Sequence, residues 1–458
     1  MATPPSAETE PALPEAPVER WLAPITRFLH IEAASGVVLL ACTAVALVLA
    51  NSPAAEWFAA VWKVPVSLAI GGFALSGDVG HLVVNDGLMA IFFFVVGLEV
   101  KREMVHGELR DRRKALLPVF AALGGVVAPA SIYLALQWGE PGQRGWAIPM
   151  ATDIAFVVGL LALFGRRVPF GFKILLLSLA IVDDLVAVLI IAVVFTETLV
   201  WGWLGLAAGA FGIVYAFNHI GVRSVGVYVV VGVFIWLAFL QSGVHPTVAG
   251  VLLGLLTPAQ AWVGRQTFAD VLKAAWERAS GESGDPHGAD ADVGRTQFAV
   301  REALSPLHRL EHGLHPWVAF GVMPLFALAN AGVPLSPSSL GEPVAIAVAA
   351  GLMIGKPVGI MIACMLAVRF RVTSLPEGVT WAMLAGGACL AGIGFTMALF
   401  LNALAFPVAD FPAFEAAGKI GTLAGSLVSA VIGAAILFSV MRRSPAKREA
   451  AGQTPPSA

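Results

Sequence analysis

The sequence has 458 residues, of which 58% are hydrophobic and only 13% are charged, and its mean hydropathy is +0.83. Soluble domains average about 25% charged residues, so this composition excludes an ordinary soluble protein and predicts a chain that mostly faces lipid or other apolar helices. The net charge of −2 does not indicate a nucleic-acid partner, and the three cysteines lack the spacing of a disulfide framework or a metal site.

The two ends of the chain are polar, unlike the long apolar region between them. Residues 1–28 are acidic and rich in proline, without the features of a signal peptide, and residues 442–458 begin with a basic run. We therefore expect two disordered cytoplasmic tails. Residues 29–441 are expected to form one membrane domain. Its polar cytoplasmic loop, 264–305, combines an amphipathic helix, ADVLKAAWERA, with a disordered stretch, SGESGDPHGADADVG.

Apolar segments recur along the membrane domain. About 20 residues at 1.5 Å rise cross the hydrocarbon core of a bilayer, so the segments predict an all-α integral membrane protein of about twelve transmembrane helices. The segments are 31–51, 82–105, 115–137, 146–165, 171–195, 200–219, 225–241, 244–258, 315–334, 343–368, 380–405 and 418–441.

Lysine and arginine concentrate in alternate connections between these segments. Basic residues cluster in 101–114, 166–173, 369–371 and 442–448, whereas the intervening connections carry few. Because basic connections remain on the cytoplasmic side, both termini are expected there.

The first external connection, KVPVSLAIGGFALSGD at 63–78, has two glycines between short apolar runs. This pattern predicts a small extracytoplasmic β-hairpin, and an interfacial or short membrane helix is the alternative. The unpaired edges of an exposed hairpin favour pairing with a second copy of the chain.

Two adjacent carboxylates, Asp183 and Asp184, lie in the middle of the apolar stretch from Leu175 to Phe195. A charged side chain at membrane depth is destabilising by about 2.5 kcal/mol or more, so a helix that only had to fold would not contain two. We expect this helix to carry ion or proton chemistry.

Two segments are interrupted near their centres. Segment 146–165 contains a proline followed by Thr152 and Asp153, and segment 380–405 contains several glycines and Thr396. Discontinuous helices in corresponding halves are typical of transporters with inverted repeats. For the glycines alone, close helix packing is the alternative interpretation.

A lysine, Lys356, lies within the apolar stretch GLMIGKPVGIMIA. Snorkelling towards the membrane surface is one interpretation, but the apolar residues on both sides favour a buried partner, Asp183 or Asp184. Neighbours on a helix point about 100° apart, so one carboxylate would pair with Lys356 while the other faces a cavity with Asp153.

Carboxylate, hydroxyl and backbone carbonyl oxygens suit a hard cation such as Na⁺, and they also suit protons. Competition of the two ions for the same oxygens, with alternating access, is the physical requirement for exchange. No cofactor is expected.

Acidic and histidine side chains near helix ends are candidates for a response to pH, because histidine titrates near neutrality. Ordinary solvated helix ends are the alternative. The candidates are Glu99, Glu103, His245, Glu311 and His312.

Ten motifs between about residues 30 and 440 resemble those of NhaA-type bacterial sodium/proton antiporters. They are ANSP (50–53), VNDGLMAIFFFVVGLEVKRE (84–103), ATDIAF (151–156), LAIVDDLVA (179–187), SGVHPTVAG (242–250), LEHGLHPWVAF (310–320), PLFALANAGV (324–333), IGKPVGI (354–360), LPEG (375–378) and GIGFTMALF (392–400).

This resemblance implies two crossed, broken helices, near 146–165 and 380–405, and electrogenic, pH-regulated exchange of cytoplasmic Na⁺ or Li⁺ for external H⁺. Asp184 matches the principal cation carboxylate of the family, and Asp183 matches the carboxylate that pairs with Lys356.

Thr152 and Asp153 match the residues between broken helix halves, and the five candidates above match positions linked to the pH response. The family also implies a bacterial inner membrane and a homodimer formed through the 63–78 hairpin. Two departures affect the expected pH profile: Pro246 follows His245, and the 264–305 loop is long.

Two other classes were weighed. An intramembrane aspartyl protease would need aspartates from two helices, such as Asp153 and Asp184, but the sequence has no GxGD-like motif and Lys356 has no role in that reaction. A passive cation channel would favour a symmetric pore lined by carbonyls or charges over a buried Asp–Lys pair. We therefore expect a transporter and not an enzyme.

Overall fold

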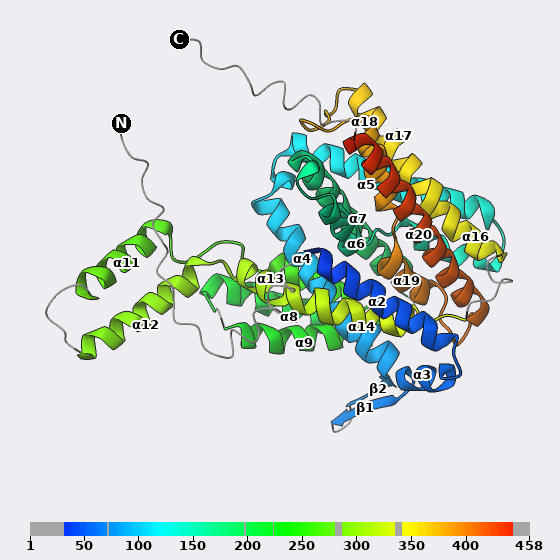
Figure 1. Ribbon diagram of the computed structural model, residues 1–458. Helices are drawn as coiled ribbons and strands as arrows, with labels where there is room; N and C mark the ends of the chain where they lie inside the picture. The colour runs from blue at the N-terminus through cyan, green and yellow to red at the C-terminus, as the bar shows by residue number, and fades with distance from the viewer. Residues whose placement is uncertain are drawn as a thin grey trace, which may run out of the picture.

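The computed structural model describes residues 32–70, 73–196, 198–222, 224–279, 286–334 and 341–442 of the chain. Figure 1 shows a body of packed helices, from which a small β-hairpin projects at one end and a pair of polar helices at another side. The expected tail 1–28, and all of the expected tail 442–458 except its first residue, lie outside the described residues.

Most of the apolar segments coincide with helices, because in lipid each backbone polar group must be hydrogen-bonded within its own segment. The helices of the body are α2 (Glu32–Ala50), α3 (Ala55–Trp62), α4 (Met89–Val105), α5 (Arg112–Leu136), α6 (Ile154–Leu163), α7 (Phe170–Val194), α8 (Trp201–Ile220), α9 (Val225–Ser242), α10 (Thr247–Leu256), α13 (Pro306–Trp317), α14 (Met323–Asn330), α16 (Pro343–Ala350), α17 (Lys356–Arg369), α18 (Trp381–Ala391), α19 (Phe395–Ala405) and α20 (Pro412–Arg442). Short π-helical segments at Val79–Leu88, Val318–Val322 and Gly351–Gly355 run directly into α4, α14 and α17.

Within the described residues, seven helices are long and apolar enough to cross a membrane, or up to ten if each of three bent pairs is one span. Of the expected segments, 244–258 contains only the ten-residue α10, and 315–334 is divided between α13, a π-helical turn and α14. The architecture is that of a helical membrane protein, and the number twelve remains a prediction.

Both interrupted segments bend at their interruptions. A 3₁₀ helix, Pro141–Met150, meets α6 at 41°, and α18 meets α19 at 44°. Each bend falls at the proline or glycine positions that the sequence analysis singled out, where a continuous helix loses hydrogen bonds or gains backbone freedom.

The connection at 63–78 contains two strands. β1 (Pro65–Ile70) and β2 (Phe73–Asp78) pair antiparallel, with Pro65 opposite Asp78 and Ile70 opposite Phe73. The two turn glycines between them lie outside the described residues. The pair projects from the body beside α3 (Figure 1).

The polar loop 264–305 is more helical than we expected. The helix α11 (Arg265–Ala279) contains the amphipathic stretch, but α12 (Pro286–Ala303) includes residues 286–294, for which the expectation of disorder is wrong. The physical reason is tertiary: α12 packs along α11, and the Glu302 carbonyl near its end accepts hydrogen bonds from the Trp262 and Val263 backbone N–H groups. Such contacts override weak local propensity. Residues 280–285 lie outside the described residues.

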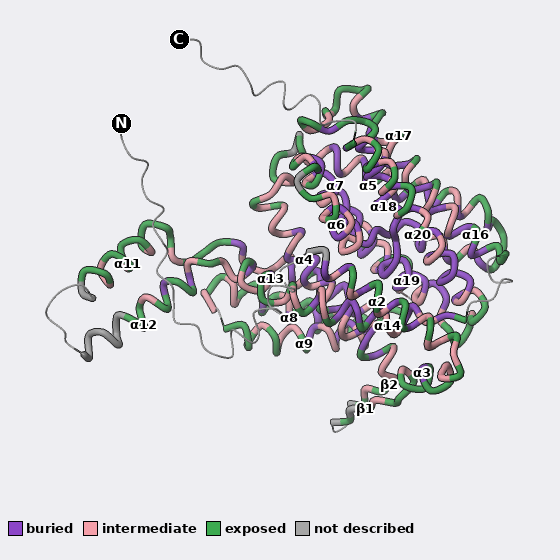
Figure 2. Tube along the Cα trace, viewed as in Figure 1, coloured by how far each residue is buried: buried purple, intermediate pink, exposed green. Residues whose placement is uncertain are grey.

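Buried residues gather at the centre of the body, where the broken helices meet α4, α7 and α20 (Figure 2). The aromatic rings of Phe172, Phe326 and Phe400 are fully buried there. Helices α8 and α9 instead present exposed apolar side chains, including Val230. An extended apolar outer face of this kind is what lipid would cover.

Helices α4 and α10 approach so closely that only small residues fit between them. A Cβ atom added to Gly254 would lie 2.6 Å from the Phe94 carbonyl oxygen and 2.8 Å from the Gly97 carbonyl carbon. Small residues allow this backbone approach, which dispersion contacts then stabilise.

We predict that Gly254→Leu lowers the thermal stability of the protein, because the added side chain forces α4 and α10 apart at a cost of about 1–3 kcal/mol. The matched control is Gly209→Leu on α8, where nothing lies within 4 Å of an added Cβ. Melting temperatures of the purified variants in detergent check this. Equal melting temperatures for the two variants would contradict it.

Candidate functional site

Helix α7 places both central aspartates inside the body. The Lys356 ammonium, at the start of α17, donates to Asp183 Oδ2 at 2.7 Å and also to the Met150 carbonyl oxygen. Both charged side chains are at most 2% exposed. The structure thus assigns Lys356 to Asp183, which the residue pattern alone left open between the two aspartates.

The second carboxylate of the pair is isolated. Asp184 is 1% exposed, and neither of its carboxylate oxygens has a hydrogen-bond partner within the described residues. The charges that act on it are Asp183, Glu99 and Asp153, which repel a negative charge, and Lys356, which attracts one. A bare carboxylate is strongly destabilised in such surroundings, so Asp184 requires a bound proton or a bound cation.

The two helix interruptions contact each other. Thr152 Oγ1 donates to the Ala391 carbonyl oxygen at 2.9 Å, and the Asp153 backbone N–H donates to the Ile393 carbonyl oxygen at 2.7 Å. Unwound backbone is tolerated at membrane depth only where its polar groups find partners. Here each broken helix supplies part of what the other has lost.

Asp153 joins the two helices that begin after the interruptions. Its Oδ1 accepts from the Phe156 backbone N–H at 3.2 Å, at the start of α6. Its Oδ2 accepts from Thr396 at the start of α19, from the backbone N–H at 3.1 Å and the hydroxyl at 2.5 Å. A carboxylate in this position caps both helices and neutralises their positive dipole ends. The sequence analysis noted the Thr396 hydroxyl but did not identify its partner.

Three of the candidates for a pH response lie around one arginine, where α4 meets α13. Arg102 forms ion pairs with Glu311 and, at 3.4 Å, with Glu103. Glu99, one turn earlier on α4, lies 3.8 Å from the His315 Nδ1 atom. Arg102 and His315 were not among the predicted site residues, although both are within the quoted motifs.

His312 is exposed, and its ring meets that of His308 edge-on with 4.7 Å between ring centroids. It is therefore at the surface of α13.

His245 belongs to a different group. Its Nε2 lies 3.7 Å from Asp86 Oδ1, and His81 Nδ1 lies 3.2 Å from the other oxygen of that carboxylate. Asp86 lies in the π-helical segment that runs directly into α4, thirteen residues before Glu99, and this separation corresponds to about 20 Å along the helix axis. The five predicted positions therefore do not form one cluster, because His245 lies near the opposite end of α4 from the group around Arg102.

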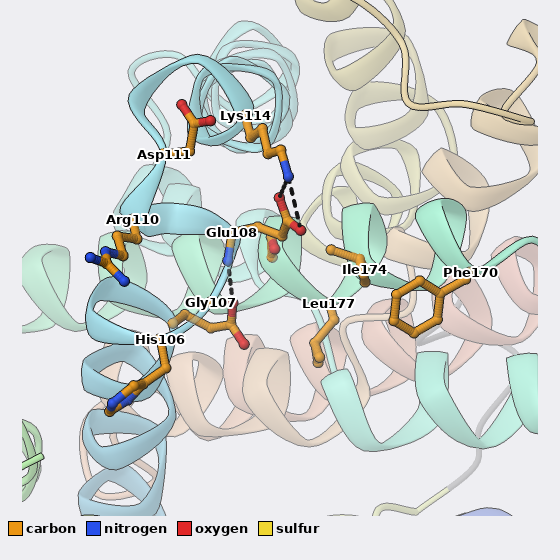
Figure 3. A pocket seen from close by; sticks show the side chains of 11 residues that line it. His106, Gly107, Glu108, Arg110, Asp111, Lys114, Phe170, Ile174 and Leu177 are labelled. Carbon is orange, nitrogen blue, oxygen red and sulfur yellow. Dashed lines mark hydrogen bonds and ion pairs between the residues drawn. The ribbon is translucent and has the colours of Figure 1, made fainter. Parts of the chain in front are cut away.

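A cavity of about 590 Å³ opens where the end of α4, the start of α5 and the first turns of α7 meet. Figure 3 shows Lys114 reaching Glu108 across it and the Glu108 backbone N–H directed at a carboxylate, which belongs to Glu103. Leu177 lines the cavity from α7. Asp184 lies further along the same helix and is not part of the lining.

Across the part of the chain that the structure describes, no group of three or more His, Cys, Asp or Glu side chains is arranged to hold a metal ion.

Comparison with known proteins assigns a family to most of the chain. The family described as Na⁺/H⁺ antiporter 1 matches residues 26–437. The Na(+)/H(+) antiporter NhaA of Rhodopirellula baltica is 49% identical over 432 residues, which cover 94% of this chain and 97% of that protein. Antiporter NhaA 2 of Acidiphilium cryptum is 48% identical, over 94% of this chain and 95% of the relative. NhaA 2 of Sorangium cellulosum is also 48% identical, over 96% and 95%.

We predict non-additive effects of substitutions at the Asp183–Lys356 pair. Asp183→Asn or Lys356→Met alone leaves the other charge buried and unpaired, which lowers the free energy of unfolding by about 3–5 kcal/mol, and the double variant recovers much of that loss. Thermal unfolding of the three purified variants measures the coupling.

The exposed pair Lys273–Glu277, 3.9 Å apart on α11, is the control and should show almost no coupling. Additive losses at Asp183 and Lys356 would contradict a buried ion pair.

A second prediction concerns Thr396. Thr396→Val removes the hydroxyl donor to Asp153 at nearly constant volume and lowers the free energy of unfolding by about 1–3 kcal/mol, whereas Thr396→Ser keeps the donor and loses less. Chemical or thermal unfolding in detergent distinguishes the two variants. A larger loss in the serine variant would show that the methyl group, not the hydroxyl, matters.

Proposed function

We propose that this chain, which belongs to the Na⁺/H⁺ antiporter 1 family, exchanges cytoplasmic Na⁺ or Li⁺ for external H⁺. Members of the family are transporters and not enzymes. One observation carries the residue-level proposal: Asp184 is fully buried and both of its oxygens lack a protein partner within the described residues.

Competition for Asp184 couples the two ions. A proton on the carboxylate removes the negative charge that a cation needs, and a bound cation occupies the oxygens that a proton would use. Because the isolated charge is unstable at this depth, the site can change the side of the membrane to which it opens only while the carboxylate holds one ion or the other. Exchange then follows without direct contact between Na⁺ and H⁺.

The cation is a hard ion that prefers oxygen ligands. Asp184 is the principal ligand in this proposal, Asp183 the second carboxylate, and Thr152 a neighbouring hydroxyl. The ion pair with Lys356 occupies Asp183 Oδ2, and Oδ1 has no hydrogen-bond partner among the residues that the structure describes. Electrogenic exchange requires more protons moving inward than cations moving outward, and the Asp183–Lys356 pair is the adjacent group proposed to carry the additional proton.

Alternating access is proposed to centre on the two interruptions. Hydrogen bonds of Asp153 with Thr396 and with the start of α6 connect the broken helices. Beside them the rings of Phe156 on α6 and Phe395 on α19 pack edge-on, with 5.0 Å between their centroids. The proposed architecture has twelve helices, inverted repeats and a crossing of the two broken helices at this point.

Regulation by pH is proposed for the group around Arg102, which joins α4 to α13 through its ion pair with Glu311. Arg102 also pairs with Glu103 on α4 itself and lies near Glu99. His245, paired with Asp86, and the exposed His312 are separate candidates for the same role.

We also propose a bacterial inner membrane with both termini in the cytoplasm, supported by the basic connections, and a homodimer formed through the edges of β1 and β2.

An aspartyl protease is disfavoured by the geometry of Asp153. Both of its oxygens accept hydrogen bonds from the starts of α6 and α19. A protease dyad would instead need that carboxylate to share a proton with a second aspartate. A passive channel is disfavoured by the buried pair of Asp183 and Lys356, which forms a discrete site and not a continuous polar path.

The exchange is tested in everted membrane vesicles that carry a respiration-driven pH gradient. Addition of NaCl or LiCl between pH 6 and 9 should collapse the gradient with the wild-type chain, and Asp184→Asn should reduce the initial rate by about tenfold or more because the charged ligand is lost. Asp270→Asn, on the polar helix α11, is the control for expression and charge.

An unaltered gradient with the wild-type chain at every pH would refute the exchange. Normal collapse with Asp184→Asn would retain the exchange but remove Asp184 as its site, and Asp153 would be the next residue to change.

A further inference from the structure

A small apolar cluster lies between the cytoplasmic cavity and Asp184. Val96 and Val100 on α4 pack against Ile181 on α7, and all three are at most 3% exposed. The cluster is distinct from the main hydrophobic core, which occupies the rest of the body.

The helical spacing places this cluster between the cavity and the site. On α7, Ile174 and Leu177 line the cavity, Ile181 follows one turn later, and Asp184 one turn after that. The rise from Leu177 to Asp184 is seven residues, or about 10 Å. The cavity and the carboxylate thus share one face of α7, with Ile181 between them.

Helix α4 shows the same order. Glu103 lines the cavity, Val100 lies one turn further in, and Val96 lies another turn beyond. Two other contacts agree with this order. Leu177, which lines the cavity, packs against one side of the cluster, and Ile154, which follows Asp153 in the chain, also packs against the cluster.

The three zones differ in polarity. The cavity carries charged side chains, including Glu108 and Lys114, and opens to water. The site beyond the cluster carries the carboxylates of Asp183 and Asp184. The apolar neighbours of the layer between them are Phe92, Leu109, Ile154, Leu177, Leu185 and Leu255. Glu99, next to Val100 on α4, is the nearby carboxyl whose charge acts on Asp184.

We propose that Val96, Val100 and Ile181 form a hydrophobic gate on the cytoplasmic side of Asp184. While the three side chains are packed, they fill the direct path from the cavity to Asp184 and offer no ligand of their own to replace the water of a hydrated cation, so ions do not pass. Separation of α4 from α7 opens the path and lets the cation reach Asp184 from the cavity. That the gate faces the cytoplasm and admits the transported cation rests on the proposed function, whereas the apolar barrier between the cavity and Asp184 does not.

The barrier is tested by the accessibility of single cysteines, which does not depend on transport. Cys42, Cys364 and Cys389 are first replaced by alanine, and then Ile174→Cys or Asp184→Cys is introduced. Everted vesicles expose the cytoplasmic face to Ag⁺, a thiol-reactive cation similar in size to Na⁺. The thiols that remain are counted with a fluorescent maleimide after unfolding in detergent.

We expect the cysteine at 174 to react about tenfold or more faster than the cysteine at 184, because only the latter lies behind the apolar layer. Adding Ile181→Ala should raise the rate at 184 by about tenfold and leave the rate at 174 nearly unchanged. The matched control is Leu179→Ala, which removes a buried side chain from the same helix but from the main core.

Three results would overturn the gate: equal rates at 174 and 184 in the chain with Ile181 intact, a rate at 184 that Ile181→Ala leaves unchanged, or an equal increase with Leu179→Ala. Val100→Ala is a smaller deletion and serves as the second test where Ile181→Ala does not reach the membrane. A failure of Na⁺/H⁺ exchange in the wild-type vesicles would refute the proposed function while leaving the accessibility result to decide the barrier separately.

Discussion

The structure depends on one physical constraint, the instability of an unpaired charge in an apolar interior. Asp183 satisfies it with Lys356, at 2.7 Å, and Asp184 has no such partner within the described residues. A carboxylate in that situation is stable only with a proton or a cation bound to it. This instability of the bare Asp184 carboxylate is the basis of the exchange chemistry proposed for this family member.

The broken helices meet a related constraint for the backbone. Interrupting a helix at membrane depth leaves polar groups without partners, and here the two interruptions satisfy each other through Thr152, Asp153 and the carbonyls of Ala391 and Ile393. Asp153 also balances the starts of α6 and α19. These hydrogen bonds hold the centre together with the apolar side chains packed around them, such as Phe156 against Phe395, and the proposed conformational change centres on this junction.

Helix α4 links the regions on which regulation would act. The π-helical segment that runs into one end carries Asp86 beside His81 and His245. The other end carries Glu103 and Arg102, which contacts α13, and the apolar side chains of Val96 and Val100 lie between. In the proposed gate, a change of charge at either end would act on the helix that carries Val96 and Val100, without requiring the titrating groups to touch the transported ion.

The sequence by itself determined the local features: the helical segments, the two interruptions, and the presence of Asp183, Asp184 and Lys356 at membrane depth. These follow from hydrophobic length and from the effects of proline, glycine and charge, which act within a few residues. Only the tertiary structure decided which aspartate meets Lys356, that Thr396 meets Asp153, that His245 lies apart from Glu311, and that α12 is helical. The reason is that these pairings join segments far apart in the chain, and periodicity describes the face of each helix but not the neighbour against which that face packs.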